Sequence, residues 1–326
     1  MNKKISSVVI LIVVLFISFQ ILSDSKDILE AVSFSFNIWK DNIFPALFPF
    51  FVISELLINY GFIEFLGELL RPLMNKLFKL KGETGFVLAM SMVSGFPSSA
   101  KYTKSLLEED IINDKEGTKL LTFTHFSNPL FILGTISILF LNNKEIGYLI
   151  LFSHFITNFI IGIVFRNYYI SENKKRKVSI RRALSLMHHK RISNDKNFGE
   201  IFTIALNKSI NTLLLILGIV TMFLVLTTII NNNVHVDNYN QSIINGVFEM
   251  TQGLKYMSLL EIPLKNKTIL STFFISLGGL SVHMQVFSII SGTKIKYLPF
   301  LIARLLHASI ASLIVYLLFD YFIANF

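Results

Sequence analysis

Four apolar stretches of this sequence are interrupted by small, polar or helix-breaking residues, the residue types best suited to bind a solute inside an apolar protein. The first interruption is the string SGFPSS, whose candidate ligands are Ser94, Gly95, Pro97, Ser98 and Ser99. Proline removes a backbone hydrogen-bond donor and glycine lets another group approach the backbone closely, so we expect a helix to break there. Backbone N–H groups and hydroxyls at such a break can bind an anion. A simple kink that packs small residues against a neighbouring helix is the alternative.

Further polar residues follow this first interruption and recur in the next apolar stretch. Lys101 is the cation closest to the break, and it could bind an anionic solute or extend its ammonium group to the cytoplasmic surface. The next stretch contains His125, Ser127 and Asn128, with Pro129 directly after them. An asparagine amide both donates and accepts hydrogen bonds, which suits it to a solute or to a neighbouring helix. Both uses are open from the sequence.

The second half of the chain offers a comparable set of candidate ligands. Glu249 lies beside Thr251 and Gln252, and it is either a proton or cation site or a solvated residue of the outer face. A Gly-Gly pair starts the other polar cluster, which comprises Gly279, Ser281, His283 and Gln285. Arg304 lies within the last apolar stretch, where a charge costs at least about 2.5–3.5 kcal/mol. A substrate carboxylate, Glu249 or contact with the membrane surface would compensate that charge.

The composition indicates that lipid surrounds the elements that carry these residues. Apolar residues make up 52% of the chain and charged residues only 16%, against about 25% charged residues in average soluble domains. Several apolar runs reach the roughly 18–20 residues needed to cross a bilayer. The net charge of +9 comes from basic residues clustered in loops beside apolar runs, as in membrane proteins, so we expect no nucleic-acid partner. The absence of cysteine excludes disulfides, thiol catalysis and cysteine-bound metal.

The order of apolar and basic segments predicts four regions. Residues 1–42 form an uncleaved N-terminal span at about 5–22 followed by an outer linker, because the run ends without a small-residue cleavage site. Residues 43–165 form a first repeat. Residues 166–208 form a cytoplasmic loop, since ten Lys or Arg face two acids within 166–196. Residues 209–326 form a second repeat.

Each repeat is expected to contain a span, an amphipathic interfacial helix, a re-entrant hairpin and a second span. These are 43–60, 61–81, 85–107 and 118–141 in the first repeat, and 209–230, 243–262, 268–293 and 298–319 in the second. With the N-terminus and the basic loop inside, and with both hairpins entering and leaving on one side, the order of spans gives the two repeats opposite orientations. The lysines at 255, 265, 267, 294 and 296 would then lie outside, against the positive-inside rule. Irregular backbone at membrane depth is tolerated only where protein or a water-filled cavity covers it. The sequence therefore predicts an all-α polytopic membrane protein with two inverted repeats, a plan typical of secondary transporters.

Several strings resemble one known family. FPALFPFFVISELL within 44–60, and SGFPSSAKYTKSLLEE and THFSNPLFI within 85–130, resemble the YlbJ sporulation integral membrane protein family, also called SpoVV. The string FEMTQG at 248–253 resembles that family's second gate-type segment. The resemblance covers roughly residues 40–320 and implies a nucleoside-recognition gate domain similar to concentrative nucleoside transporters. It also implies transport of dipicolinic acid across the outer forespore membrane during sporulation.

We therefore expect a membrane transporter for a small anionic aromatic solute, dipicolinic acid, in the cell membrane or outer forespore membrane. A nucleoside transporter and a non-transporting sporulation scaffold are the alternatives. The chain lacks the motifs GxxxxGK[ST], HExxH and GxSxG, which argues against ATP-driven transport and against a hydrolase. We expect no catalytic residues, no cofactor and no metal, because His188 and His189 have no further ligands nearby. Membrane lipid is an expected partner, and a homo-oligomer is open.

Overall fold

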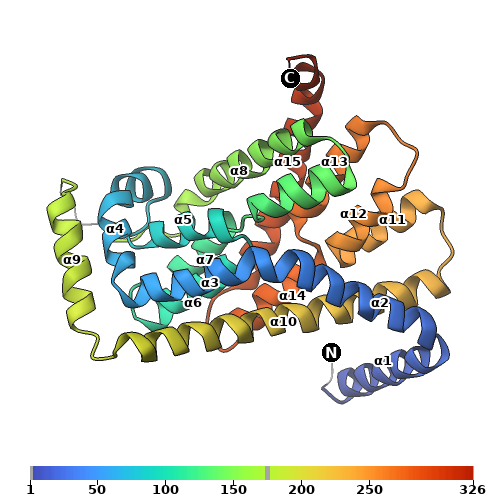
Figure 1. Ribbon diagram of the computed structural model, residues 1–326, viewed down its shortest axis with the longest axis horizontal. Coiled ribbons are helices and arrows are strands. Elements are labelled where there is room, and N and C mark those ends of the chain that lie inside the picture. Colours follow the sequence, from blue (N-terminus) through green and yellow to red (C-terminus); the bar gives the residue numbers. More distant parts are fainter. Residues whose placement is uncertain (1–2, 173–176, 326) are drawn as a thin grey trace.

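The structure is a computed structural model that describes residues 3–172 and 177–325, and all regular secondary structure within those ranges is helical (Figure 1). Five of the described helical segments are long and apolar enough to cross a membrane: Ser25–Asn59, Lys144–Asn167, Phe198–Asn233, Leu264–Ile290 and Tyr297–Asn325. These segments confirm the expected all-α polytopic membrane protein.

The N-terminal region is helical throughout its described residues, which corrects the expected outer linker at 23–42. It consists of α1 (Lys3–Ser23), α2 (Ser25–Ile38), a π-helical turn (Trp39–Ile43) and α3 (Phe44–Asn59). Ser35 lies on the buried face of α2, where its hydroxyl is 2.8 Å from that of Thr221 on the long helix α10 (Phe198–Asn233). Trp39 also donates to the Leu213 carbonyl over 2.9 Å. Most polar residues of 23–42 therefore lie on the exposed face of a packed helix, whereas Ser35 is buried.

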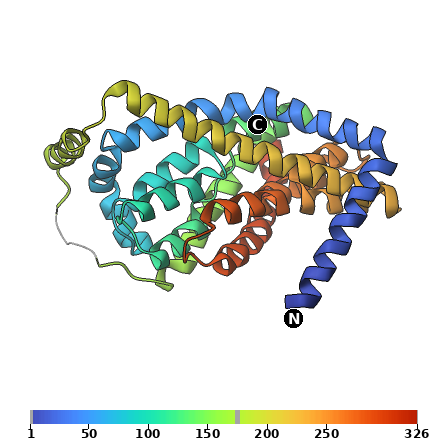
Figure 2. The ribbon, with the colours of Figure 1, turned by 90° about the horizontal axis from the view of Figure 1, so that it is seen from below.

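Helix α10 runs beside α2 and α3 along the length of the molecule, while α1 projects away from this body (Figure 2). An apolar cluster forms the seam between α3 and α10, and it includes Leu47, Phe51, Leu213, Ile216 and Val220. Burial of such apolar surfaces fixes the two helices against each other. This pair forms one wall of the site described below.

The first half contains the expected helix break at 94–99. Its elements are α4 (Phe62–Leu73) with a π-helical turn (Met74–Phe78), α5 (Thr84–Ser94), α6 (Ser98–Glu108), α7 (Asp114–Phe123), a π-helical segment (Phe131–Phe140) and α8 (Lys144–Val164). Helices α5 and α6 pack against each other, so 85–107 folds back as a hairpin. Residues 124–128 are not helical and interrupt the second apolar stretch where SNP was expected to interrupt it.

The basic region expected as a loop at 166–208 is partly helical. A short 3₁₀ turn (Phe165–Asn167) is followed by α9 (Ile180–Ile192), and α10 already begins at Phe198. Lys174, Lys175 and Arg176 of the basic run lie outside the described residues. Helix α9 packs on α4, and Lys190 donates to Glu109 over 2.7 Å. This hydrogen bond raises the pKa of Lys190.

The hairpin of the second half lies earlier in the chain than expected. Its elements are α11 (Asn238–Phe248), α12 (Met250–Ser258), α13 (Leu264–Leu277), α14 (Gly279–Ile290) and α15 (Tyr297–Asn325). The single amphipathic helix expected at 243–262 is two helices, α11 and α12, which break at Glu249 and pack closely together. The expected hairpin at 268–293 does not fold back on itself: α13 packs on α15 and α12, whereas α14 packs on α10, α6 and α11.

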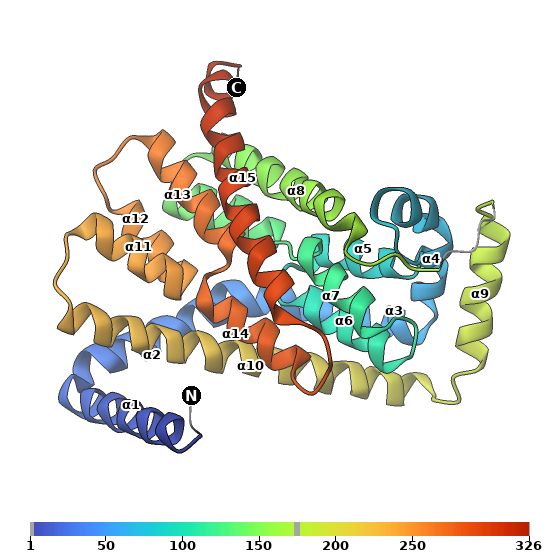
Figure 3. The same cartoon turned by 180° about the vertical axis from the view of Figure 1, so that it is seen from behind.

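The two halves share an order of elements: a hairpin, an interrupted helix and a long helix. Corresponding elements also make corresponding contacts, since α6 packs on α14 while α12 packs on the π-helical segment Phe131–Phe140. Likewise, α7 packs on α15 while α13 packs on α8. The hairpins α5–α6 and α11–α12 approach the centre of the molecule from opposite ends (Figures 1 and 3). The interrupted parts of both halves thus meet in the middle.

Close packing within α11–α12 gives a first testable expectation. A Cβ atom at Gly253 would overlap the Cα and N atoms of Gly246. Gly253→Ala should therefore push the two helices apart and lower the free energy of unfolding by about 1–3 kcal/mol. The matched control is Gly218→Ala in α10, where a Cβ meets nothing within 4 Å and helix propensity favours alanine by up to about 1 kcal/mol. Equal thermal unfolding of the two detergent-solubilised variants would contradict this packing.

Candidate functional site

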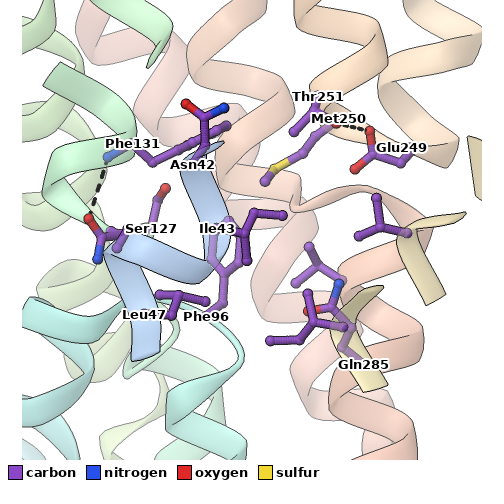
Figure 4. A pocket seen from close by; sticks show the side chains of 15 residues that line it. Asn42, Ile43, Leu47, Phe96, Ser127, Phe131, Glu249, Met250, Thr251 and Gln285 are labelled. Atoms are coloured by element: carbon purple, nitrogen blue, oxygen red, sulfur yellow. Dashed lines mark hydrogen bonds between the residues drawn. The ribbon is translucent and has the colours of Figure 1, made fainter. Parts of the chain in front are cut away.

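A central pocket lies where the interrupted segments meet (Figure 4). Its wall combines the turn between α2 and α3, the tip of α5–α6, residues 127–131, the start of α12, and parts of α10 and α14. Its polar lining residues are Asn42, Ser127, Asn128, Glu249, Thr251 and Gln285. Glu249 is the one formally charged residue among all those that line the pocket.

Asn128 joins the first hairpin to the interrupted helix. Its side-chain oxygen accepts from the N–H of Leu130 over 2.7 Å and thereby caps the π-helical segment. Its amide nitrogen donates to the carbonyls of Val93 and Ser94 at the end of α5, both over 3.3 Å. Gly95 has a φ of +77°, and a Cβ there would stand 2.5 Å from the backbone nitrogen of Asn128. Both the backbone conformation and this close approach therefore require glycine.

Glu249 lies at the tip of α11–α12. Its carboxylate caps α12 by accepting from the N–H of Gln252 over 2.9 Å, and it also accepts from the hydroxyl of Thr251. The Ser281 hydroxyl of α14 lies 3.5 Å away. Gly279 has a φ of +63°, and a Cβ there would stand 3.1 Å from the Met250 nitrogen. In Figure 4 the carboxylate of Glu249 and the side chain of Ser127 lie on opposite sides of Ile43.

Arg304 does not line this pocket, although a substrate carboxylate was one of its three expected partners, beside Glu249 and the membrane surface. The side chain is fully buried, and it donates to the carbonyls of Thr122 and His125 over 2.6 and 3.2 Å. It also donates to Asn158 Oδ1 over 3.1 Å and to His307 Nδ1 over 2.7 Å. These acceptors include backbone groups freed where α7 ends. Arg304 therefore holds the interrupted helix in place.

His154 supports the same interruption from α8, and the sequence gave no indication of it. Its Nε2 accepts from the N–H of Ser127 over 2.9 Å, so its Nδ1 carries the proton donated to the Ser276 hydroxyl over 3.0 Å. The Nε2 of His307 lies 2.9 Å from the His154 carbonyl and donates to it. A lone polar residue in an apolar helix is recognisable, but its backbone partner is visible only in three dimensions.

Several other predicted ligands are held by the protein itself, and they do not line the pocket. Lys101 pairs with Glu55 over 3.1 Å. His283 contacts the Tyr297 hydroxyl over 2.6 Å and the Leu277 carbonyl over 3.0 Å. Gln252 accepts from the hydroxyl of Thr227.

The residues of the first break support the tip of α5–α6. The hydroxyls of Ser94 and Ser98 donate to the carbonyls of Met90 and Gly95, respectively. Ser99 is buried, and its hydroxyl has no hydrogen-bond partner within the described ranges. Pro97 follows a cis peptide bond. The ring of His125 stacks on Phe96 with centroids 5.1 Å apart.

The sequence predicted five of the pocket residues and missed the rest. Ser127, Asn128, Glu249, Thr251 and Gln285 were candidates and do line the pocket. The missed residues are the amide Asn42, the aromatic Phe96 and Phe131, and aliphatic residues including Leu47, Ile216 and Val220. Apolar lining residues have no distinguishing signal in an apolar chain, and Asn42 belongs to the region that was expected to be a linker.

Comparison with known proteins identifies the relatives of this chain. Residues 42–144, which include the tip of α5–α6 and Asn128, match the Gate family, described as nucleoside recognition. The chain is 34% identical to the sporulation integral membrane protein YlbJ of Bacillus subtilis (strain 168), over 97% of this chain and 83% of that relative. No solved structure matches. The chain therefore belongs to the YlbJ family of sporulation integral membrane proteins and carries a nucleoside-recognition gate domain.

Proposed function

We propose that this protein is a secondary carrier of a small aromatic solute during sporulation. The observation that carries this proposal is the central pocket formed by the two hairpins and the two interrupted helices. Helix ends left without backbone partners are tolerated at membrane depth where they surround a cavity. Carriers of several folds bind their solutes between such interrupted helices near the middle of the bilayer.

Dipicolinic acid is the solute we favour, in the cell membrane or the outer forespore membrane. The aromatic rings of Phe96 and Phe131 and the amides of Asn42 and Gln285 suit a flat molecule with polar edges. The family membership supports a solute needed in sporulation. A carboxylate solute would face Glu249 with no cation in the lining, and like charges this close disfavour each other. We therefore propose that a proton bound at Glu249 or on the solute accompanies transport.

A nucleoside is the second candidate solute. The match to a nucleoside-recognition family covers the first hairpin and the interrupted helix after it. The pocket offers amide, hydroxyl and carboxylate groups, which can accept and donate hydrogen bonds to a ribose and a base without needing a cation.

The transport cycle we propose is alternating access between two inverted repeats. Residues 43–165 and 209–326 form the repeats, and the described residues of 166–196 face the cytoplasm. The shared order of elements in the two halves, and the approach of the hairpins from opposite ends, support this arrangement. Motion of the hairpins against the α3–α10 wall would expose the pocket to each side in turn.

Uptake into proteoliposomes tests the proposal. Purified protein should accumulate radiolabelled dipicolinate, and Gln285→Leu should reduce the initial rate about fivefold to tenfold, because the variant loses a hydrogen bond to the solute. Gln285 makes no hydrogen bond to any other residue that the structure describes, so its replacement should not change the unfolding temperature.

Gln241→Leu on α11, outside the pocket, is the matched control and should transport normally. Uptake of uridine but not of dipicolinate would favour the nucleoside carrier. Uptake of neither solute by a correctly folded protein would favour the non-transporting scaffold.

A further inference from the structure

Three cavities follow one another along α10. The central pocket touches this helix at residues 216–220. An open hollow, here called the vestibule, touches it at 208–215, toward the end that carries α9, and it is also lined by α3, α6 and α14. A third cavity touches it at 224–232. Because a helix rises about 1.5 Å per residue, the three cavities follow one another in order along the axis of α10.

A cluster of three charges, Glu55, Lys101 and Lys208, lies in the wall of the vestibule. The carboxylate of Glu55 on α3 is 3.1 Å from Lys101 Nζ on α6 and 3.4 Å from Lys208 Nζ on α10. The side chains of Glu55 and Lys101 are only 1% and 10% exposed, whereas that of Lys208 is 54% exposed. The Lys101 ammonium also stands 4.6 Å from the ring of Phe51, which belongs to the apolar seam between α3 and α10.

The cluster has one carboxylate for two ammonium groups. Lys101 Nζ and both Glu55 oxygens make no hydrogen bond beyond these ion pairs within the described ranges. The other vestibule lysine, Lys104, already has an acid near it, since Glu108 lies 3.9 Å away. A buried ion pair adds little stability because desolvation offsets its attraction. One further carboxylate would balance the charge of the cluster. Glu55 would then remain paired with Lys208, and the added carboxylate would bind Lys101.

We propose that Glu55, Lys101 and Lys208 form a carboxylate-loading site that also closes the α9 end of the path. Lys101 belongs to the hairpin arm α6, whereas Glu55 and Lys208 belong to the α3–α10 wall. The Glu55–Lys101 contact therefore ties the hairpin to the wall in this state. A solute carboxylate that takes Lys101 from Glu55 releases the hairpin and opens the central pocket. This inference rests on the proposed carrier function and extends it to a second site.

Single-cysteine labelling tests this site without measuring transport. The chain has no cysteine, so Val220→Cys in the central pocket gives one reactive position. We measure its reaction with a membrane-impermeant maleimide added from the α9 side of proteoliposomes. Glu55→Gln, which breaks the tie, should raise the labelling rate about tenfold. Dipicolinate should raise it in the Val220→Cys protein, and uridine should not.

Two lysine variants separate the loading site from general charge effects. Lys101→Met should remove the response to dipicolinate, whereas Lys104→Met, in the same vestibule, should keep it. An unchanged labelling rate in Glu55→Gln, or a dipicolinate response that survives Lys101→Met, would overturn the proposal. Thermal unfolding identifies misfolded variants. The double variant Glu55→Lys, Lys101→Glu exchanges the two charges of the ion pair and should therefore restore slow labelling. Labelling changes without any flux would support the loading site while contradicting the carrier function.

Discussion

Arg304→Ala is expected to abolish uptake and to lower the free energy of unfolding by at least about 3 kcal/mol. The fully buried guanidinium donates hydrogen bonds to two backbone carbonyls, to Asn158 and to His307. Removing it leaves these acceptors unpaired at the point where α7 ends, and a buried unpaired acceptor costs more than its hydrogen bond contributes. The interrupted helix that positions Ser127 and Asn128 at the pocket should therefore lose its fixed shape.

Thermal unfolding in detergent and dipicolinate uptake measure the two effects of Arg304→Ala together. Arg304→Lys keeps the charge but cannot reach all the acceptors of a planar guanidinium, so we expect an intermediate loss of stability. Arg181→Ala on the exposed surface of α9 is the control and should behave as the native protein. A normal unfolding temperature combined with lost solute binding would instead support direct contact of Arg304 with the solute.

Local residue chemistry was sufficient to predict the helix breaks in the first half. Pro97 and Pro129 cannot donate a backbone hydrogen bond, and Gly95 adopts a positive φ. Because these effects act within a few residues, the sequence places the breaks at SGFPSS and SNP without knowledge of the rest of the molecule. The long apolar runs likewise predict four of the five candidate spanning segments. The fifth, Leu264–Ile290, was expected as a re-entrant hairpin, and the spans expected at 5–22 and 118–141 are not among the five.

The position of the second hairpin was wrong because its cause is tertiary. The break between α11 and α12 contains neither proline nor glycine, and Glu249 itself caps the new helix. The fold-back depends on the contact of Gly246 with Gly253, which are seven residues apart. Conversely, the positive φ angles of Gly278 and Gly279 end one helix and begin another, but α13 and α14 pack mostly against different helices and not against each other. A Gly-Gly pair therefore predicts a break and not the direction in which the chain continues.

The candidate site shows the same division between local and tertiary causes. The sequence singled out Arg304 because a buried charge is rare, but its acceptors are largely backbone carbonyls, which a side-chain pattern cannot show. His154 was missed for the same reason, since its partner is the N–H of Ser127. Pocket lining residues were predicted where they are polar and missed where they are aromatic or aliphatic, because apolar residues are common throughout this chain.

Glu249→Gln is expected to uncouple transport from the proton gradient while leaving the fold intact. Glutamine keeps an oxygen that can accept from the N–H of Gln252, so the cap of α12 should survive. It cannot bind and release a proton, however, and Glu249 is the one ionisable group in the lining of the central pocket. If one proton accompanies each dipicolinate, a gradient of about one pH unit should raise accumulation by the native protein about tenfold. The same gradient should leave accumulation by Glu249→Gln unchanged.

Proteoliposomes with equal and with unequal internal and external pH measure this coupling directly. Glu261→Gln is the control, because Glu261 is exposed and lies outside the pocket, so its variant should respond to the gradient as the native protein does. Glu249→Ala should in addition lose the cap and about 1 kcal/mol of stability, which separates the structural role of this carboxylate from its protonation. If Glu249→Gln still responds to the gradient, the coupling proton is not carried by residue 249. It would then be carried by the solute or by another group.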